Sequence, residues 1–264
     1  MIPSFHVDAN GSAFASLQVI TRREAYSVTF PSSLFHAARD CFQVELGQNI
    51  FSQAGCRLNI KNRDMELYGT LRYGPFYPLP YSIMGPFAHL PFMQCKHNIW
   101  SMMHRVEGTL YLNGTELDFQ NGIGYIEGDR GSSFPRRYLW TQCNWSAQSL
   151  FLSIAEIPYL GIRFLGCIGV ILFEGKQYRI ATYRGVRLLH VSDQAVLLRQ
   201  GSLSLEISRL NLEALPLRAP KQGSMTRMIH ESAAGRVRYK CTLHGRILFD
   251  FISEHANFES EWND

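Results

Sequence analysis

Apolar and polar residues alternate along most of the chain with the two-residue period of β-strands, and no segment keeps a helical period beyond about ten residues. The clearest case surrounds Asn113-Gly114, a dipeptide typical of tight hairpin turns. A two-residue turn there places Leu110 opposite Leu117 and separates an apolar face from a polar one. The pattern predicts an all-β protein of antiparallel hairpins, arranged as one or two barrels.

Four segments depart from this pattern. A serine after a proline predicts a short helix over residues 31–40. The four prolines within residues 73–87 have no N–H to donate to a sheet ladder. We therefore expect this segment to be either a lid over an apolar opening or a loop packed on the core. Residues 219–232 predict a loop with at most one helical turn, and the acidic residues 255–264 are expected to fray.

The stretch GYIEGDRGSSFPRRYLWTQCN, residues 124–144, combines carboxylates, arginines and aromatic rings in strand alternation on both sides of one turn. Strand alternation places Tyr125, Glu127 and Asp129 on one face of the first segment. It also places four side chains on one face of the second segment, namely Tyr138, Trp140, Gln142 and Asn144. If the two segments pair as a hairpin, a polar and aromatic wall faces the inside of a barrel. The alternative is that this wall is the solvent side of a sheet.

Composition narrows the class of protein. With 264 residues, 46% hydrophobic and 18% charged, the chain suits one large β domain or two small ones. The net charge of +4 is small and the basic residues are scattered along the chain, so no nucleic-acid partner is expected. No apolar run reaches the ~18 residues of a membrane-spanning helix, which leaves only peripheral membrane contact open. The first residues lack the features of a secretory signal, so we expect a cytoplasmic protein.

The six cysteines are widely spaced and without a CxxC pair, so we expect reduced, mostly buried thiols. His97 has only Cys95 as a near neighbour of metal-ligand type, and no zinc site is expected. Glycine patterns for nucleotide binding and a nucleophile elbow are absent from the sequence. The sequence therefore predicts neither a metal nor another cofactor.

Several motifs in the chain occur in the order and spacing of a known family. They are IMGPF at 83–87, MQCKHNIWSMMH at 93–104, GYIEGDRGSSFP at 124–135 and YLWTQCN at 138–144. Together they resemble the tocopherol cyclase-like family, and the chain looks most like its compact bacterial branch. The resemblance implies two lipocalin-like β-barrels packed together, similar to carotenoid hydratases of the hydroxyneurosporene synthase type. We expect one barrel from residues 1–135 and the other from residues 136–264.

The family resemblance also implies a chemistry. The plant relatives protonate a prenyl double bond and let a phenol oxygen close a ring, which needs an apolar cavity and a general acid but no cofactor. Carried over to this sequence, Asp129 is the first choice of acid and Glu127 its partner or alternative. His97 and His104 are second-line candidates for a proton relay.

The same carry-over predicts side chains that contact a ligand. Trp140 and Tyr138 would line the cavity, while Gln142 and Asn144 would orient an oxygen atom; the full set adds Tyr125, Arg136, Met84 and Met102. Each has a structural alternative. Glu127 could pair with Arg130 or Arg136, and Trp140 could fill a core.

The chain departs from the family at two points. Gly128 and Arg130 stand where the family usually has Lys and Trp, and family members begin with an extra strand that precedes the Met1-Ile2-Pro3 start of this chain. Either the start is misassigned or a piece of the site is missing, and an unpaired edge would be left.

Two functions therefore stay open. One is a cofactor-independent cyclase, hydratase or isomerase acting on a lipophilic, prenylated molecule; the other is a non-catalytic lipocalin-like binder of a hydrophobic ligand. A third interpretation is a structural barrel that binds a partner, which applies if the barrels are filled with side chains. A carboxylate that points into the cavity without an ion-pair partner would favour the enzyme. The sequence sets neither the substrate nor the oligomeric state.

Overall fold

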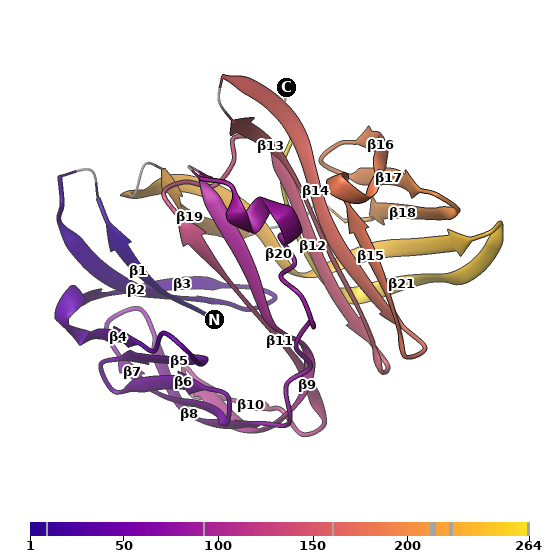
Figure 1. Ribbon diagram of the computed structural model, residues 1–264. Helices are drawn as coiled ribbons and strands as arrows, with labels where there is room; N and C mark the ends of the chain where they lie inside the picture. Colours follow the sequence, from indigo (N-terminus) through magenta and orange to yellow (C-terminus); the bar gives the residue numbers. More distant parts are fainter. Residues whose placement is uncertain (9, 92, 160, 212–214, 222–223, 263–264) are drawn as a thin grey trace.

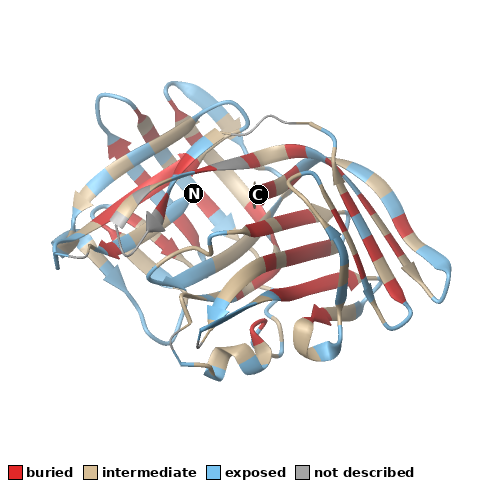
Figure 2. Cartoon of the chain, turned by 90° about the horizontal axis from the view of Figure 1, so that it is seen from above, coloured by how far each residue is buried: buried red, intermediate tan, exposed pale blue. Residues whose placement is uncertain are grey.

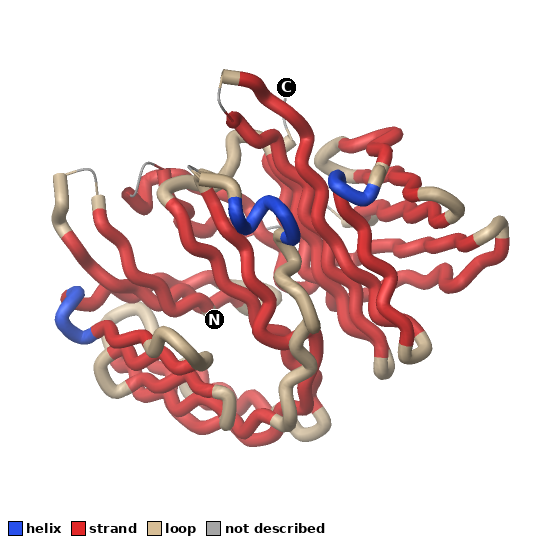
Figure 3. Tube along the Cα trace, in the orientation of Figure 1, coloured by secondary structure: helices blue, strands red, loops and turns tan. Residues whose placement is uncertain are grey.

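The computed structural model describes residues 1–8, 10–91, 93–159, 161–211, 215–221 and 224–262, and most of them belong to antiparallel strands. The helical segments of this part of the chain are single 3₁₀ turns, namely η1 (Ser32–Leu34), η2 (Gly85–His89) and η3 (Thr182–Arg184) (Figure 3). Within the same ranges, no helix is long and apolar enough to cross a membrane. The predicted all-β class is confirmed.

The first half of the chain forms two sheets (Figure 1). The smaller sheet has the order β1-β2-β3, from β1 (Ile2–Val7), β2 (Ala13–Ile20) and β3 (Ala25–Pro31). The larger sheet has the order β10-β9-β8-β7-β6-β5-β4, and β11 pairs with β9 outside this path. Its strands are β4 (Phe35–Ala37), β5 (Gln43–Leu46), β6 (Asn49–Ser52), β7 (Gly55–Lys61), β8 (Glu66–Tyr73), β9 (Cys95–Leu112), β10 (Thr115–Asp118) and β11 (Gly122–Gly131).

The second half forms one ten-stranded sheet with the order β15-β14-β13-β12-β21-β20-β18-β17-β16, and β19 pairs with β20. Its strands are β12 (Tyr138–Trp145), β13 (Gln148–Tyr159), β14 (Ile162–Phe173), β15 (Lys176–Ala181), β16 (Arg187–Val191), β17 (Ala195–Gln200), β18 (Leu203–Arg209), β19 (Leu215–Lys221), β20 (Ser224–Leu243) and β21 (Arg246–Glu261). The chain passes from the N-terminal sheets to the ten-stranded C-terminal sheet between β11 and β12. The division into barrels at residues 135 and 136 stays a prediction.

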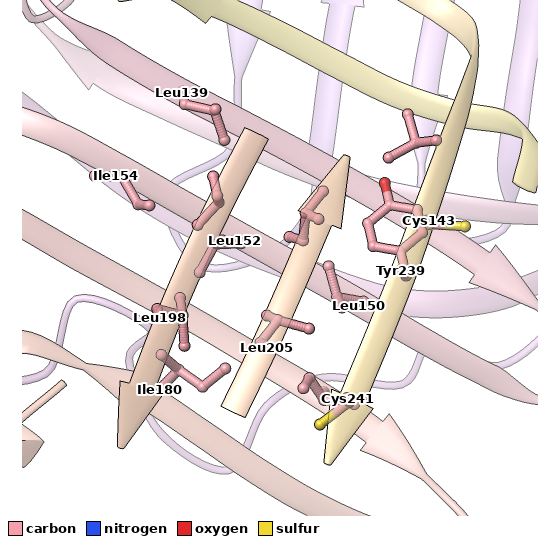
Figure 4. Packing of buried hydrophobic residues seen from close by; sticks show 14 of the residues in the cluster. Leu139, Cys143, Leu150, Leu152, Ile154, Ile180, Leu198, Leu205, Tyr239 and Cys241 are labelled. Carbon is pink, nitrogen blue, oxygen red and sulfur yellow. The ribbon is translucent and has the colours of Figure 1, made fainter. Parts of the chain in front are cut away.

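Each half has its own hydrophobic core. The N-terminal core gathers side chains from the two first sheets, among them Leu17, Leu58 and Leu110. In the C-terminal core, Leu150 and Leu152 of β13 face Leu198 and Leu205, which come from β17 and β18 (Figure 4). Buried residues alternate with more exposed ones along many strands, as expected for sheets with one core face (Figure 2).

A third apolar cluster joins the two halves, and we call it the inter-sheet layer. It lies where the outer face of β13 and β14 meets β9 and the proline-rich segment, and it consists of Ile83, Met84, Ile99, Met102, Phe151, Ile168, Val170 and Leu172. Strand β13 explains how this arises, because Leu150 and Leu152 point into the C-terminal core while Phe151 points the other way. The long central strands therefore bury both faces.

The predicted hairpin at Asn113-Gly114 is confirmed. Leu110 lies opposite Leu117, and the two turn residues have φ angles of 50° and 79°. Such a turn needs positive φ at both central positions, which asparagine and glycine tolerate best.

The predicted helix over residues 31–40 is wrong. Only η1 is helical there, no side chain caps it, and β4 follows at once and pairs with β5. Phe35 packs against the N-terminal core from this short strand. Pairing and burial thus outweigh the local helix signal of a serine after a proline.

Two predictions for the last third of the chain are also wrong. Residues 219–221 and 224–232 belong to β19 and β20, where Leu217, Ala219 and Ile229 form a small buried cluster, and residues 222–223 lie outside the described ranges. The expected frayed end is strand β21 up to Glu261, because Ala256 and Phe258 are fully buried in the C-terminal core. Residues 263–264 of that end lie outside the described ranges.

In the proline-rich residues 73–87, Tyr73 ends β8, and residues 74–84 lie outside the sheets, as predicted, until η2 begins at Gly85. Ile83 and Met84 are buried in the inter-sheet layer, so this segment packs on the molecule rather than standing away from it. The Arg179 guanidinium lies 3.9 Å from the centre of the Tyr81 ring and donates a hydrogen bond of 3.1 Å to the Ser82 carbonyl. The segment is thereby fastened to β15.

All six cysteines are free thiols. Four of them are buried, Cys95 is half-buried and Cys41 is exposed, in agreement with the prediction of reduced, mostly buried residues.

Candidate functional site

The two halves of the polar stretch 124–144 do not pair as a hairpin, so the condition set for a wall formed by one hairpin is not met. β11 pairs with β9, whereas β12 pairs with β13 and β21, so the segments belong to different sheets. Their polar faces nevertheless meet, because the Trp140 indole N–H donates a hydrogen bond of 3.2 Å to Glu127 Oε2. The polar and aromatic wall lies beside the inter-sheet layer, against which Tyr125 and Trp140 pack.

His97 lies between the two carboxylates of β11. The register of β9 and β11 places Asp129 opposite His97 and Glu127 opposite Ile99, so both carboxylates share a face with the imidazole. His97 Nδ1 hydrogen-bonds Asp129 Oδ1 at 2.7 Å, and Nε2 lies 3.0 Å from Glu127 Oε2. The second contact is an ion pair without hydrogen-bond alignment. We call these three residues the histidine–carboxylate cluster.

The cluster reaches from the protein interior to its surface. The His97 ring stacks on Phe151 with centroids 4.9 Å apart, and only 10% of its side chain is exposed. The Asp129 side chain keeps 32% of its surface exposed, and it also accepts a long contact of 3.5 Å from Cys95 Sγ. Glu127 Oε2 accepts a 2.5 Å hydrogen bond from the Tyr125 hydroxyl besides that from Trp140. Asp129 therefore forms the solvent edge of the cluster.

The charges of the cluster support one another. Burial alone would lower the pKa of His97, but the adjacent charges of Glu127 and Asp129 outweigh it and raise the pKa to about 10. Burial works in the opposite direction on Asp129, and the His97 imidazolium overcomes it and holds the pKa of Asp129 below its usual value. Burial first, and then the charge of Glu127, raises the pKa of Tyr125 well above its ordinary value. At neutral pH the cluster is an imidazolium between carboxylates.

A second polar group lies on the same face of β12 and β21. Gln142 Oε1 accepts a hydrogen bond of 3.0 Å from Asn257 Nδ2. Gln142 Nε2 and Asn144 Oδ1 are buried without a hydrogen-bond partner among the described residues. These two atoms, predicted to orient an oxygen of a ligand, are therefore free to do so.

Glu259 is a third buried carboxyl group at this face. It lies opposite Trp140 in the register of β12 and β21, and its Oε1 accepts a hydrogen bond from the Tyr138 hydroxyl. Burial, followed by the negative charges of Asp129, Glu127 and Glu261, raises its pKa well above the ordinary value.

Some predicted site residues lie elsewhere. His104 hydrogen-bonds Ser101 at 3.1 Å and packs between Tyr73 and Phe76, and burial lowers its pKa to about 4. Arg136 is exposed, and only its carbonyl takes part in a described contact, as an acceptor from Arg227. Met84 and Met102 are both buried in the inter-sheet layer.

Sequence reasoning missed three residues of the site. Phe151 and Cys95 carry no local signal, since their roles depend on which strands meet. Glu259 was overlooked because it lies within residues 255–264, which we expected to fray. The alternation of Ala256 and Phe258 with polar residues was the signal that could have found it.

No family model matches the chain, and no curated protein sequence matches it. Among solved structures, the fold is similar to kievitone hydratase from Nectria haematococca, with a TM-score of 0.53 and 11% identity over 98% of this chain and 88% of that one. It is also similar to a Nitrosomonas europaea protein assigned to AttH, with a TM-score of 0.52 and 12% identity over 99% of this chain and 91% of that one.

Both proteins belong to the tocopherol cyclase-like, lipocalin-like fold group. At these identities the likeness concerns the fold alone, and it agrees with the fold class that the sequence predicted.

Proposed function

We propose that this protein binds a lipophilic small molecule carrying a phenol and a prenyl chain, and that it promotes addition of the phenol O–H across a double bond of that chain. The observation that carries the proposal is the His97 imidazole held between Glu127 and Asp129 at the border of the inter-sheet layer. The prenyl chain would lie against apolar side chains such as Met84 and Met102, and the phenol at the cluster. The addition breaks the phenol O–H bond and the π bond of the alkene and forms one C–O and one C–H bond, so it is redox-neutral overall and needs no redox cofactor.

The roles within the cluster follow from its charges. Asp129 is ionised at neutral pH because its pKa is lowered, so in this proposal it positions His97 instead of acting as the acid first expected from the sequence. The adjacent carboxylates raise the pKa of His97 to about 10, so at neutral pH it is an imidazolium that keeps its proton, and in this proposal it positions the phenol oxygen instead of accepting its proton. Glu127 holds the other side of the imidazole.

The surrounding residues suit the other needs of such a reaction. The rings of Tyr125 and Trp140 border the inter-sheet layer, and aromatic faces stabilise a developing carbocation. The unpartnered Gln142 Nε2 and Asn144 Oδ1 would orient a ligand oxygen. His104 has no role in the proposal, since it contacts neither carboxylate and its low pKa keeps it neutral.

The similar fold of a protein named as a hydratase supports this class of reaction, because a hydratase also adds an O–H group across a double bond. The likeness supports the class of reaction and leaves the substrate to experiment.

A non-catalytic lipocalin-like binder is the second candidate. It is favoured by one observation, namely that both carboxylates of β11 already have an ion-pair partner in His97. In that case the cluster would only hold the strands together and bind a polar group of the ligand.

Incubation with a panel of prenylated phenols and quinols in heavy water tests the proposal. The expected product is a cyclised isomer with one carbon-bound deuterium, detected by mass spectrometry. His97→Gln should slow its formation by ~10²-fold, the order of loss expected when a reacting group is misplaced by about 1 Å. His36→Gln, at an exposed position, is the matched control. Binding without deuterium uptake would favour the binder, and a panel neither bound nor converted would overturn both candidates.

A further inference from the structure

We infer that Glu259 is the carboxylic acid that donates the proton to carbon in the proposed addition, with Tyr138 as the residue that positions it. This inference rests on the proposed function and adds the acid that the histidine–carboxylate cluster lacks. The Glu259 O–H bond breaks as a C–H bond forms on the prenyl chain. The phenol oxygen then bonds to the cationic carbon and gives up its proton, which restores the acid, so protons and charges balance.

The position of Glu259 fits this role. It shares a face of the C-terminal sheet with Trp140, its register partner, and with Asn257, which hydrogen-bonds Gln142. Its strand neighbours Ala256 and Phe258 point into the C-terminal core instead. Only 7% of Glu259 is exposed, and Trp140 beside it donates to Glu127. Glu259 and the histidine–carboxylate cluster therefore both lie beside Trp140.

Its hydrogen bonds and neighbouring charges favour a neutral acid. His97 contacts Glu127 and Asp129, whereas the described partner of Glu259 is the neutral Tyr138 hydroxyl. The Arg227 guanidinium lies 5.5 Å from the centre of the Tyr138 ring, but it donates to the carbonyls of Pro135 and Arg136 and lies 3.7 Å from Glu261. A third buried carboxylate without a cation would be costly.

The result is a division of labour between carboxyl groups of similar chemistry. Asp129 stays ionised beside the His97 imidazolium because its pKa is lowered, while Glu259 keeps its proton because burial and the neighbouring negative charges raise its pKa. Environments that push the pKa values of neighbouring carboxyl groups apart are typical of acid–base sites. The general acid that the sequence assigned to Asp129 is thereby assigned to Glu259.

Infrared difference spectroscopy tests the protonation state without a substrate. At neutral pH the wild-type protein should show the carbonyl band of a protonated carboxylic acid, and Glu259→Gln should lose it. Glu254→Gln, at an exposed carboxylate paired with Arg236, should keep the band. A wild-type spectrum identical to that of Glu259→Gln in this region would mean an ionised Glu259 and would overturn the inference, whatever the activity.

Turnover tests the role itself. With a prenylated phenol that the wild-type protein converts, Glu259→Gln should bind the compound equally but incorporate deuterium at least ~10²-fold more slowly. Tyr138→Phe should shift the carbonyl band and slow turnover less. Circular dichroism and thermal unfolding check that both variants fold. Unchanged turnover in Glu259→Gln would overturn this inference alone, whereas no turnover by the wild-type protein on any compound would overturn the proposed function with it.

Discussion

At the scale of single residues, the environment decides what each carboxyl group does. The sequence placed Glu127 and Asp129 on one face, because alternation along a strand is local. It could not find their partner, since His97 reaches both only through the register of β9 against β11. Nor could it rank the acids, because burial and neighbouring charges depend on which strands pack together.

The raised pKa of His97 links folding to pH. Its value is about 10 in the folded protein against an ordinary 6.5, so the folded state holds an extra proton between these limits. This stabilisation is fully present below about pH 6.5 and is lost as the pH rises through about 10. The lowered pKa of Asp129 acts in the opposite window, and its contribution is lost as the pH falls below 3.8.

We therefore predict that the free energy of unfolding falls between pH 7 and pH 10, by up to about 1.4 kcal/mol per pH unit for one extra proton. In His97→Gln the fall should be shallower. Part of it should remain, because the raised pKa of Glu259 acts with the same sign. Urea unfolding at several pH values measures this. Parallel curves for wild type and variant would show that His97 carries no extra proton in the folded state.

At the scale of elements, strand β11 combines a site with an irregular register. The pairing with β9 shifts between Gly124 and Ile126 and again between Ile126 and Glu127. Such bulges re-aim side chains, and the sequence contained no signal for them. Two of the four glycines of this strand, Gly124 and Gly128, differ in surroundings, which provides a matched pair of substitutions.

Gly124→Ala should destabilise the protein by about 2 kcal/mol, because the new Cβ would collide with the buried His104 ring and come within 2.8 Å of Val106 Cγ2. Gly128→Ala should change stability by less than about 0.5 kcal/mol, since the nearest atom to its Cβ is Trp100 Nε1 at 4.0 Å. Thermal unfolding of both variants checks this. Equal losses would contradict the packing described for β11.

At the scale of the molecule, the period of the sequence predicted the all-β class, and its short motifs pointed to the fold group that the structural comparison supports. The sequence pattern did not predict contacts between segments that are distant along the chain. Gln18 of β2 exchanges two hydrogen bonds of 2.9 Å with the backbone of Arg218 in β19, and no local pattern announces such a pair. One feature of the sequence did indicate the inter-sheet layer. Strands buried on both faces are nearly continuous apolar runs, and residues 149–154 form such a run.

The proposed site depends most on the charge state of His97, which an NMR pH titration of the ¹⁵N-labelled histidine side chains measures directly. We predict that the His97 imidazole stays doubly protonated through neutral pH and loses its proton only near pH 10, while buried His104, with a pKa of about 4, is neutral throughout. Asp129→Asn should move the His97 midpoint towards lower pH. A wild-type His97 that titrates near 6.5 would contradict the imidazolium between two carboxylates, and with it the proposed site.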